Sequence, residues 1–445
     1  MSYALGVDLG SSFVAAATAF GPRARMAFLG DNAAVAPSVV YQGADGGLLT
    51  GEVAGRRAAA DPGRAASGFK DLLGEQTSVT LAGQPRSVVD LLAAQLRDVL
   101  RRVAEAEGAP PERLVLTRPA SWGAYRQRLF AEAPRLVGRA DTVMISDAEA
   151  VAAYFAEAHG LPSGSLLAVY DLGGGSFDAA VLGVRPGGVE ILGRPEGFER
   201  LGGTTFDEAV LDLVISSSAG ALDELDMGDP ATVAALARLR HDCVVAKESL
   251  SSDTEATVPV LVPGRHLEVR VTRAAFEERV HARIDATVAS LWRVLRSAQV
   301  TPAQLSALLL VGGSSRIPLV AQLVSQMVGR PVTPYPHGKH AVVLGAARLG
   351  VLAAAGGPVP PPPPPQQSPP RQPPPPKPPP DPPPQHPPPP QTNPAPPAPH
   401  PPTRHGHADG DWEPTATSRM LVIGVAVLAL IVVALVVVFA LLIRI

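Results

Sequence analysis

Two segments of the chain combine an aspartate that ends an apolar run with a turn of glycine and serine. The first is residues 7–12 (VDLGSS) and the second is residues 170–178 (YDLGGGSFD). Glycine lets the backbone approach an anion closely, and the N–H groups and hydroxyls of such turns point toward it. Two turns of this kind facing each other would clamp a polyphosphate.

The aspartates in these segments indicate a metal ion beside the phosphates. Asp8, Asp171 and Asp178 would repel a phosphate directly, but a carboxylate can hold the water shell of a Mg²⁺ that bridges phosphate oxygens. Each turn taken alone is equally consistent with an ordinary hairpin between two strands. The chain contains no GxxxxGK[ST] segment, so its phosphate site is not a P-loop.

The elements that must position these turns alternate between strands and helices. Apolar runs at 3–8, 114–116, 166–170 and 307–311 predict buried strands. Residues 87–107 repeat apolar side chains every three to four positions, which predicts a long helix with one apolar face. Strands followed by helices predict an α/β fold. Because the aspartate-glycine turn occurs twice, we expect a duplicated lobe with a ligand between the two copies.

Five further segments make the pattern specific. They are residues 68–74 (GFKDLLG), 119–120 (PA), 201–207 (LGGTTFD), 238–252 (RLRHDCVVAKESLSS) and 311–318 (VGGSSRIP). Together with the two turns, and in order and spacing over roughly residues 1–350, they resemble the nucleotide-binding domain of the seventy-kilodalton heat-shock chaperones, the DnaK-like proteins. The resemblance implies the actin-like ATPase fold, in which two lobes enclose Mg-ATP.

The resemblance also implies roles for individual residues. The phosphate turns would be Gly10, Ser11, Ser12 and Phe13 and then Gly173, Gly174, Gly175 and Ser176, with Gly202 and Gly203 beside them. Around the adenosine would be Lys247, Ser251, Gly313, Ser314 and Arg316, and Gly312 would be a further nucleotide-binding residue. Lys70 would steady the transferred phosphoryl group or its attacking water. Asp8 and Asp171 would hold Mg²⁺, and Asp147, Asp171 and Asp178 would be the catalytic carboxylates.

Several positions depart from the family's pattern. Asp147 aligns with a glutamate of the family, so its carboxylate lies about one methylene further back and hydrolysis is expected to be slow, unless Glu149 substitutes for it. Val244 and Glu248 replace a glutamate and an arginine of the family's adenosine helix, and Lys339 replaces an aspartate near the end of the domain. Loss of a cation that stacks on the base predicts weaker adenine binding.

Composition excludes several other classes of protein. The 445 residues carry a formal net charge of −3, which does not favour nucleic acid as a partner. The single cysteine, Cys243, excludes a disulfide scaffold and is expected to be a packed thiol. The ten histidines are scattered and predict no metal site. The first residues lack the pattern of a secretory signal peptide.

The end of the chain predicts a spacer and a membrane anchor. Of the 49 prolines, 29 fall within residues 358–402, so we expect residues 356–418 to be a disordered, Pro-rich linker in an extended conformation. Its prolines could also bind proteins with aromatic grooves. Residues 420–443 are 24 residues without a charge, which predicts a transmembrane helix within an anchor at 419–445. The basic residues before this span favour a cytoplasmic N-terminal body at the cell membrane.

The sequence therefore predicts an ATPase domain over residues 1–355 and a function with several open alternatives. The leading hypothesis is a membrane-anchored, heat-shock-chaperone-like ATPase that hydrolyses Mg-ATP slowly. The family's linker, peptide-binding domain and lid are not expected, because Leu352 leads directly into Gly356 and the prolines. The alternatives are a nucleotide-dependent membrane scaffold with little hydrolysis and an actin-like polymerising element. A sugar kinase of the same superfamily fits the residues 311–318 motif poorly.

Overall fold

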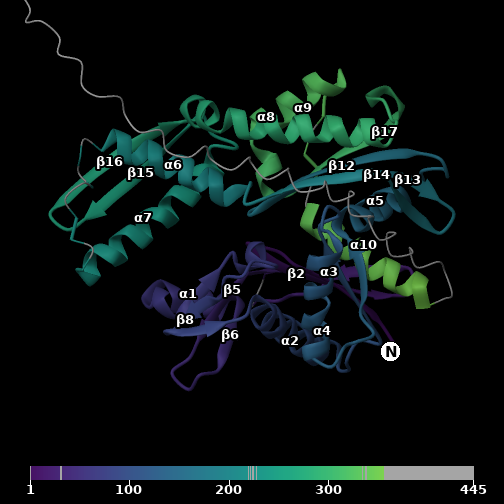
Figure 1. Ribbon diagram of the computed structural model, residues 1–445, viewed down its shortest axis with the longest axis horizontal. Coiled ribbons are helices and arrows are strands. Elements are labelled where there is room, and N and C mark those ends of the chain that lie inside the picture. The colour runs from purple at the N-terminus through teal and green to yellow at the C-terminus, as the bar shows by residue number, and fades with distance from the viewer. Residues whose placement is uncertain are drawn as a thin grey trace, which may run out of the picture. The chain divides into compact units, whose positions relative to one another are not determined.

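The computed structural model describes residues 2–354, apart from 31–32, 219, 221, 223–224, 227, 333 and 336–337, and describes only the backbone of 339 and 353–354 (Figure 1). The predicted Pro-rich linker at 356–418 and the predicted anchor at 419–445 lie outside the described residues. None of the helices described here is long and apolar enough to cross a membrane.

The first sheet carries the first aspartate-glycine turn. Its strand order is β11-β10-β1-β2-β3, with β4 paired to β2. The strands are β1 (Ala4–Leu9), β2 (Phe13–Phe20), β3 (Arg23–Met26), β4 (Val35–Pro37), β10 (Arg113–Arg118) and β11 (Val143–Ser146). β1 pairs antiparallel with β2 and parallel with β10, and β10 is parallel to β11. The end of β1, where Asp8 lies, is therefore in the middle of the sheet.

The second sheet repeats this plan around the second turn. Its order is β14-β13-β12-β17, formed by β12 (Leu166–Leu172), β13 (Ser176–Arg185), β14 (Gly188–Glu199) and β17 (Leu305–Val311). β12 pairs antiparallel with β13 and parallel with β17. In both sheets, the strand that ends in the aspartate lies between its hairpin partner and a parallel strand. This repeat agrees with the predicted duplication.

Two helices and a shared core lie next to both sheets. α5 (Asp147–Ala158) and α10 (Gly338–Ala354) belong to a buried cluster that includes Val115 of β10 and Val169 of β12. α10 also packs on β1, where a Cβ on Gly6 would overlap the α10 backbone. Glycine at position 6 therefore permits the close approach of helix to strand.

The remaining helices and short strands lie beside one or the other of the two sheets (Figure 1). Beside the first sheet are α1 (Gly51–Ala60), α2 (Val88–Glu107), α3 (Ala124–Phe130), α4 (Glu132–Leu136), β5 (Val39–Gln42), β6 (Leu48–Thr50), β7 (Ala65–Ser67), β8 (Val79–Leu81), β9 (Gln84–Arg86) and two 3₁₀ turns, η1 (Pro62–Arg64) and η2 (Phe69–Leu72). Beside the second are α6 (Gly203–Ser217), α7 (Pro230–Ser249), α8 (Arg273–Ser297), α9 (Pro318–Val328), the hairpin β15 (Glu255–Val262) and β16 (Arg265–Thr272), η3 (Pro302–Gln304) and η4 (Gly313–Arg316).

The predicted elements are confirmed. The four apolar runs form β1, β10, β12 and β17, and the periodic segment forms α2. The side chain of Ser87 caps the start of α2 by accepting a hydrogen bond from the Asp90 amide at 3.0 Å. Gly108 follows its end with a φ of 75°, a conformation that favours glycine. The sequence signals for this helix are therefore local ones.

Candidate functional site

The first turn is a tight hairpin between β1 and β2. The Gly10 amide donates to the Phe13 carbonyl at 3.1 Å, so Gly10, Ser11 and Ser12 make the bend. Phe13 is the first residue of β2, and the residue is 39% exposed. The segment is thus an ordinary hairpin, as one interpretation of the sequence had it. It can still be a phosphate turn, because Ser11 and Ser12 lie in the bend, at the end of the strand pair.

The second turn is built in the same way and is tied to a helix. The Gly173 amide donates to the Ser176 carbonyl at 2.9 Å. The Gly173 and Gly174 carbonyls accept hydrogen bonds from the Gly203 and Thr204 amides, at 3.0 and 2.7 Å. The start of α6 is therefore held against the second turn, and helix N-termini are favourable places for an anion.

The two turns lie against each other. A Cβ built on Gly174 would overlap the hydroxyl of Ser12 and lie 2.9 Å from the Ser12 Cβ. A Cβ on Gly202 would lie 2.8 Å from the Gly173 carbonyl oxygen. These positions have no room for a side chain, so glycine is required sterically where residues distant in sequence meet.

Ser314 contacts the second turn, and Lys247 contacts the adjoining start of α6. The Ser314 hydroxyl donates to the Gly173 carbonyl at 2.8 Å, and the Lys247 ammonium lies 3.4 Å from the Gly203 carbonyl. Lys247 also forms an ion pair with Asp207 at 2.7 Å. Burial raises the pKa of the Asp207 carboxyl, and Lys247 opposes the rise. Sequence reasoning did not select Asp207, although it ends the residues 201–207 motif.

The other predicted nucleotide-binding residues are sequence neighbours of Ser314 or of Lys247, and they differ in exposure. Gly312 has a φ of 85°, and a Cβ there would overlap the Leu172 carbonyl. Gly313 and Arg316 are exposed on η4. Ser251 is half-buried just after α7, where its amide donates to the carbonyl of Glu248 at 3.1 Å. The side chain of Glu248 itself is exposed, and that of Lys339 lies outside the described part of the chain.

Lys70 is buried beside Asp8. Its ammonium lies 3.9 Å from the Asp8 carboxylate, and only 6% of Lys70 is exposed. The same ammonium lies 5.5 Å from the centre of the Trp122 ring and 5.8 Å from that of Phe130. A buried cation needs such partners because it has given up its water. The ammonium is therefore packed between an acidic partner at the end of β1 and two aromatic rings.

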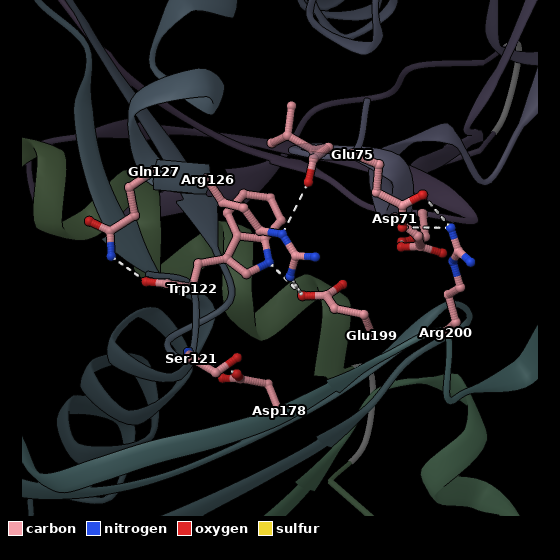
Figure 2. Close-up of polar contacts among 11 residues, drawn as sticks. Asp71, Glu75, Ser121, Trp122, Arg126, Gln127, Asp178, Glu199 and Arg200 are labelled. Carbon is pink, nitrogen blue, oxygen red and sulfur yellow. Dashed lines mark hydrogen bonds and ion pairs between the residues drawn. The ribbon is translucent and has the colours of Figure 1, made fainter. Parts of the chain in front are cut away.

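Asp171 and Asp178 are directly opposite each other on β12 and β13. The Asp178 carboxylate is buried and accepts hydrogen bonds at 2.9 Å from the Ala120 and Ser121 amides, which follow β10 of the first sheet (Figure 2). Burial raises its pKa to about 7; the bonds from Ser121 and Ala120 oppose this rise, and the charge of Asp147 adds to it.

This raised pKa predicts a pH-dependent stability. Between pH 3.8, the ordinary pKa of an aspartate, and about pH 7, the unfolded chain has lost the Asp178 proton while the native protein keeps it. Stability contributed by this group is therefore lost as pH rises, by up to about 1.4 kcal/mol per pH unit. Asp178→Asn does not titrate, and the backbone hydrogen bond that its NH2 group cannot accept lowers its stability by the same amount at every pH. Melting curves of both proteins are measured in EDTA without nucleotide. The melting temperature of the variant, relative to that of the unchanged chain, should increase from pH 5 to pH 7. A difference that stays constant over this range would contradict the raised pKa of Asp178.

Asp147 and Glu149 have different structural roles. Asp147 is the first residue of α5, and Ser146 is the residue that caps the helix. The Glu149 carboxylate accepts hydrogen bonds from the Ser146 amide at 2.8 Å and the Ser146 hydroxyl at 2.7 Å, which completes a capping box. Because Glu149 is engaged in this cap, Asp147 is the better placed of the two to serve the site.

Ion pairs also connect the second sheet to the segments around η2 and α3 (Figure 2). Glu199, at the end of β14, pairs with Arg126 and accepts a hydrogen bond from the Trp122 indole at 3.0 Å. The next residue, Arg200, pairs with Glu75 at 2.6 Å. Sequence reasoning missed this network, because no motif relates residues that are about 75 to 125 positions apart.

Two further expectations concern metals and thiols. Within the described residues, no three His, Cys, Asp or Glu side chains gather into a metal-binding group. Cys243 is a buried free cysteine in α7, and burial raises its thiol pKa to about 11. A thiol with a raised pKa is a poor nucleophile, so the prediction of a packed cysteine is confirmed.

Comparison with known proteins gives consistent matches. The model of a family described as Hsp70 protein matches residues 76–356. The chaperone protein DnaK of Elusimicrobium minutum (strain Pei191) is 29% identical over 364 residues, which cover 79% of this chain and 58% of that protein. The chaperone protein DnaK of Cenarchaeum symbiosum (strain A) is 29% identical over 366 residues, 79% of this chain and 55% of that protein. The chain thus spans little more than half the length of these relatives.

Proposed function

Since the chain belongs to the Hsp70 family, we propose that residues 1–355 are a nucleotide-binding ATPase domain that binds Mg-ATP and hydrolyses it slowly. The observation that carries this proposal is the contact between the two glycine turns at Gly174 and Ser12. The buried ion pair of Lys70 with Asp8, near the end of β1, lies next to the first of these turns. Backbone amides, hydroxyls and one fixed cation are the groups that recognise a polyphosphate.

The residues present fit a nucleotide triphosphate. Gly174 and Gly202 have no space for a Cβ, so glycine there allows the two turns and the start of α6 to come close together. Ser11 and Ser12 on the first turn carry hydroxyl groups, and the start of α6 lies beside the second turn, held there by its Gly203 and Thr204 amides. Lys247 and Ser314 lie next to the same turn, on the side proposed for the adenosine.

The residues present also fit a magnesium ion. Asp8 and Asp171 end the central strands of the two sheets and would hold it. Magnesium in phosphate sites typically has one or two protein carboxylates and fills its other positions with water and phosphate oxygens, so a larger cluster of acidic residues is not needed. When bound, the ion would neutralise charge on the phosphates.

Lys70 and the carboxylates account for the hydrolytic step. Lys70 holds a positive charge where negative charge develops on the transferred phosphoryl group, and its partners Asp8, Trp122 and Phe130 restrict its movement. Asp178 is held by two amides and would orient water together with Asp147. The shorter side chain of Asp147 is the reason that we propose slow turnover.

The alternative is a nucleotide-dependent scaffold with little hydrolysis, favoured by the same Asp147. Single-turnover hydrolysis by the full chain, with Mg²⁺ and with EDTA, separates the two functions. We expect product formation with Mg²⁺ that EDTA abolishes. Tight ATP binding by calorimetry without turnover would favour the scaffold, and absence of ATP binding would refute both. Faster turnover by Asp147→Glu would show that the shorter side chain of Asp147 is what slows hydrolysis.

We further propose that the domain is anchored at the cell membrane with its ATPase unit in the cytoplasm. The support is the uncharged segment 420–443 and the basic residues that precede it. At 3.1 Å per residue, the 45 residues from 358 to 402 would reach about 140 Å if fully extended, enough to act as a spacer that also binds proteins with aromatic grooves. The full chain should enter the membrane fraction of cells and resist carbonate extraction. Recovery of the chain in the soluble fraction would contradict the anchor.

A further inference from the structure

Asp71 lies directly after Lys70 on η2, and its carboxylate belongs to the phosphate turns rather than to the surface. It accepts a hydrogen bond from the hydroxyl of Ser11, on the first turn. The residue is half-buried. Figure 2 shows it beside Arg200, next to the ion pair of Arg200 with Glu75. No role was predicted for this aspartate, although it lies inside the residues 68–74 motif.

The same carboxylate also touches the second turn. A Cβ built on the buried Gly175 would overlap both oxygens of the Asp71 carboxylate. The carboxylate therefore lies against the Gly175 backbone while Ser11 donates to it. One anion thus contacts both of the turns that are proposed to hold phosphates.

The surroundings of Asp71 are those of an anion site. Burial raises the pKa of its carboxyl; the Ser11 hydrogen bond and the charges of Lys70, Arg200 and Arg126 oppose that rise. A carboxylate held away from water needs such donors and cations to remain there. Phosphate oxygens need the same kinds of partners.

We infer that Asp71 is an internal anion that occupies part of the phosphate site and competes with the phosphates of ATP. The inference rests on the proposed function, since it concerns the same turns. The Ser11 hydroxyl has one proton and cannot donate it to the carboxylate and to a phosphate at once. Two anions on the same turns repel each other. ATP therefore binds only when the Asp71 side chain leaves Ser11, which lowers the affinity for the triphosphate.

The test compares ATP with a ligand that lacks phosphates. Asp71→Asn keeps the size of the side chain and removes its charge. In the full chain, calorimetry should show ATP binding tightened about tenfold, as expected for removal of a like charge next to the ligand, and adenosine affinity unchanged. Asp45→Asn is the matched control, because it removes a carboxylate from an exposed turn; both of its affinities should stay the same.

Each other outcome counts against a specific statement. If the unchanged chain binds ATP and the folded variant binds it equally or more weakly, Asp71 does not compete with phosphate. Equal gains for ATP and adenosine would show a structural effect and would also overturn the inference. If neither protein binds ATP, the proposed function fails together with the inference. Asp71→Ala, which removes the carboxylate altogether, repeats the comparison should the asparagine variant not fold, as judged by its melting curve.

Discussion

Replacement of Lys70 by alanine should leave ATP binding measurable and reduce single-turnover hydrolysis by roughly 10²–10³-fold. Lys70 is held 3.9 Å from Asp8 and over the Trp122 ring, so its charge is in place before the reaction begins. A fixed cation stabilises the negative charge that develops in the transition state more than it stabilises the bound substrate. Its removal should therefore act on the rate constant rather than on affinity.

The measurement is a rapid-quench time course with enzyme in excess over ATP, together with calorimetry. Lys247→Ala is the matched control, because it removes a second lysine of the site that lies at Gly203 instead of Asp8. It should weaken ATP binding and change the rate of bound ATP much less. Since Lys70 is a buried partner of Asp8, melting curves must show that the variant is folded. Unchanged turnover in folded Lys70→Ala would remove the lysine from the catalytic machinery.

Replacement of Gly174 by valine should abolish detectable ATP binding, a loss of more than about 100-fold. The Cβ position at Gly174 is already occupied by the hydroxyl and Cβ of Ser12, so even one added carbon must push the two turns apart. Overfilling a closely packed contact forces shifts of the backbone. The donors of the first turn would then no longer face those of the second.

Gly188→Val provides the comparison for this substitution. Gly188 begins β14, and nothing lies within 4 Å of its Cβ position, so a branched side chain fits there. This variant should bind ATP like the unchanged chain in the same calorimetric titration. If folded Gly174→Val still bound ATP tightly, the second turn would not be a phosphate turn.

The two predictions concern residues that were identified from the sequence on different grounds. The importance of Gly174 could be predicted from the residues 170–178 motif, because glycine at a strand end has a local physical meaning. The selection of Lys70 depended on a family resemblance, since most lysines are exposed. Only the packing of Trp122 and Phe130 beneath its ammonium explains why this lysine is buried.

The roles of the carboxylates were harder to predict. From sequence, Asp178 is expected to organise metal and water, but its pKa is raised by burial, and the amides that oppose the rise, those of Ala120 and Ser121, follow a strand of the other sheet. The sequence allows Glu149 as a substitute for Asp147, but the structure places Glu149 in a helix cap. Asp71 was not selected at all. In each case, the chemistry of a carboxylate depends on which charges and donors surround it, and these come from distant parts of the chain.

The sequence by itself determined the strands, the long helix α2, the two aspartate-glycine turns and the family. These features rest on local rules: apolar periodicity, a serine at a helix start, and glycine where the backbone bends. Only the tertiary structure decided that Ser12 meets Gly174, that Lys70 is buried on aromatic rings, and that Asp71 lies between Ser11 and Gly175. The physical reason is that desolvation and charge interactions act through space, so they appear only when folding brings distant residues within a few ångströms of each other.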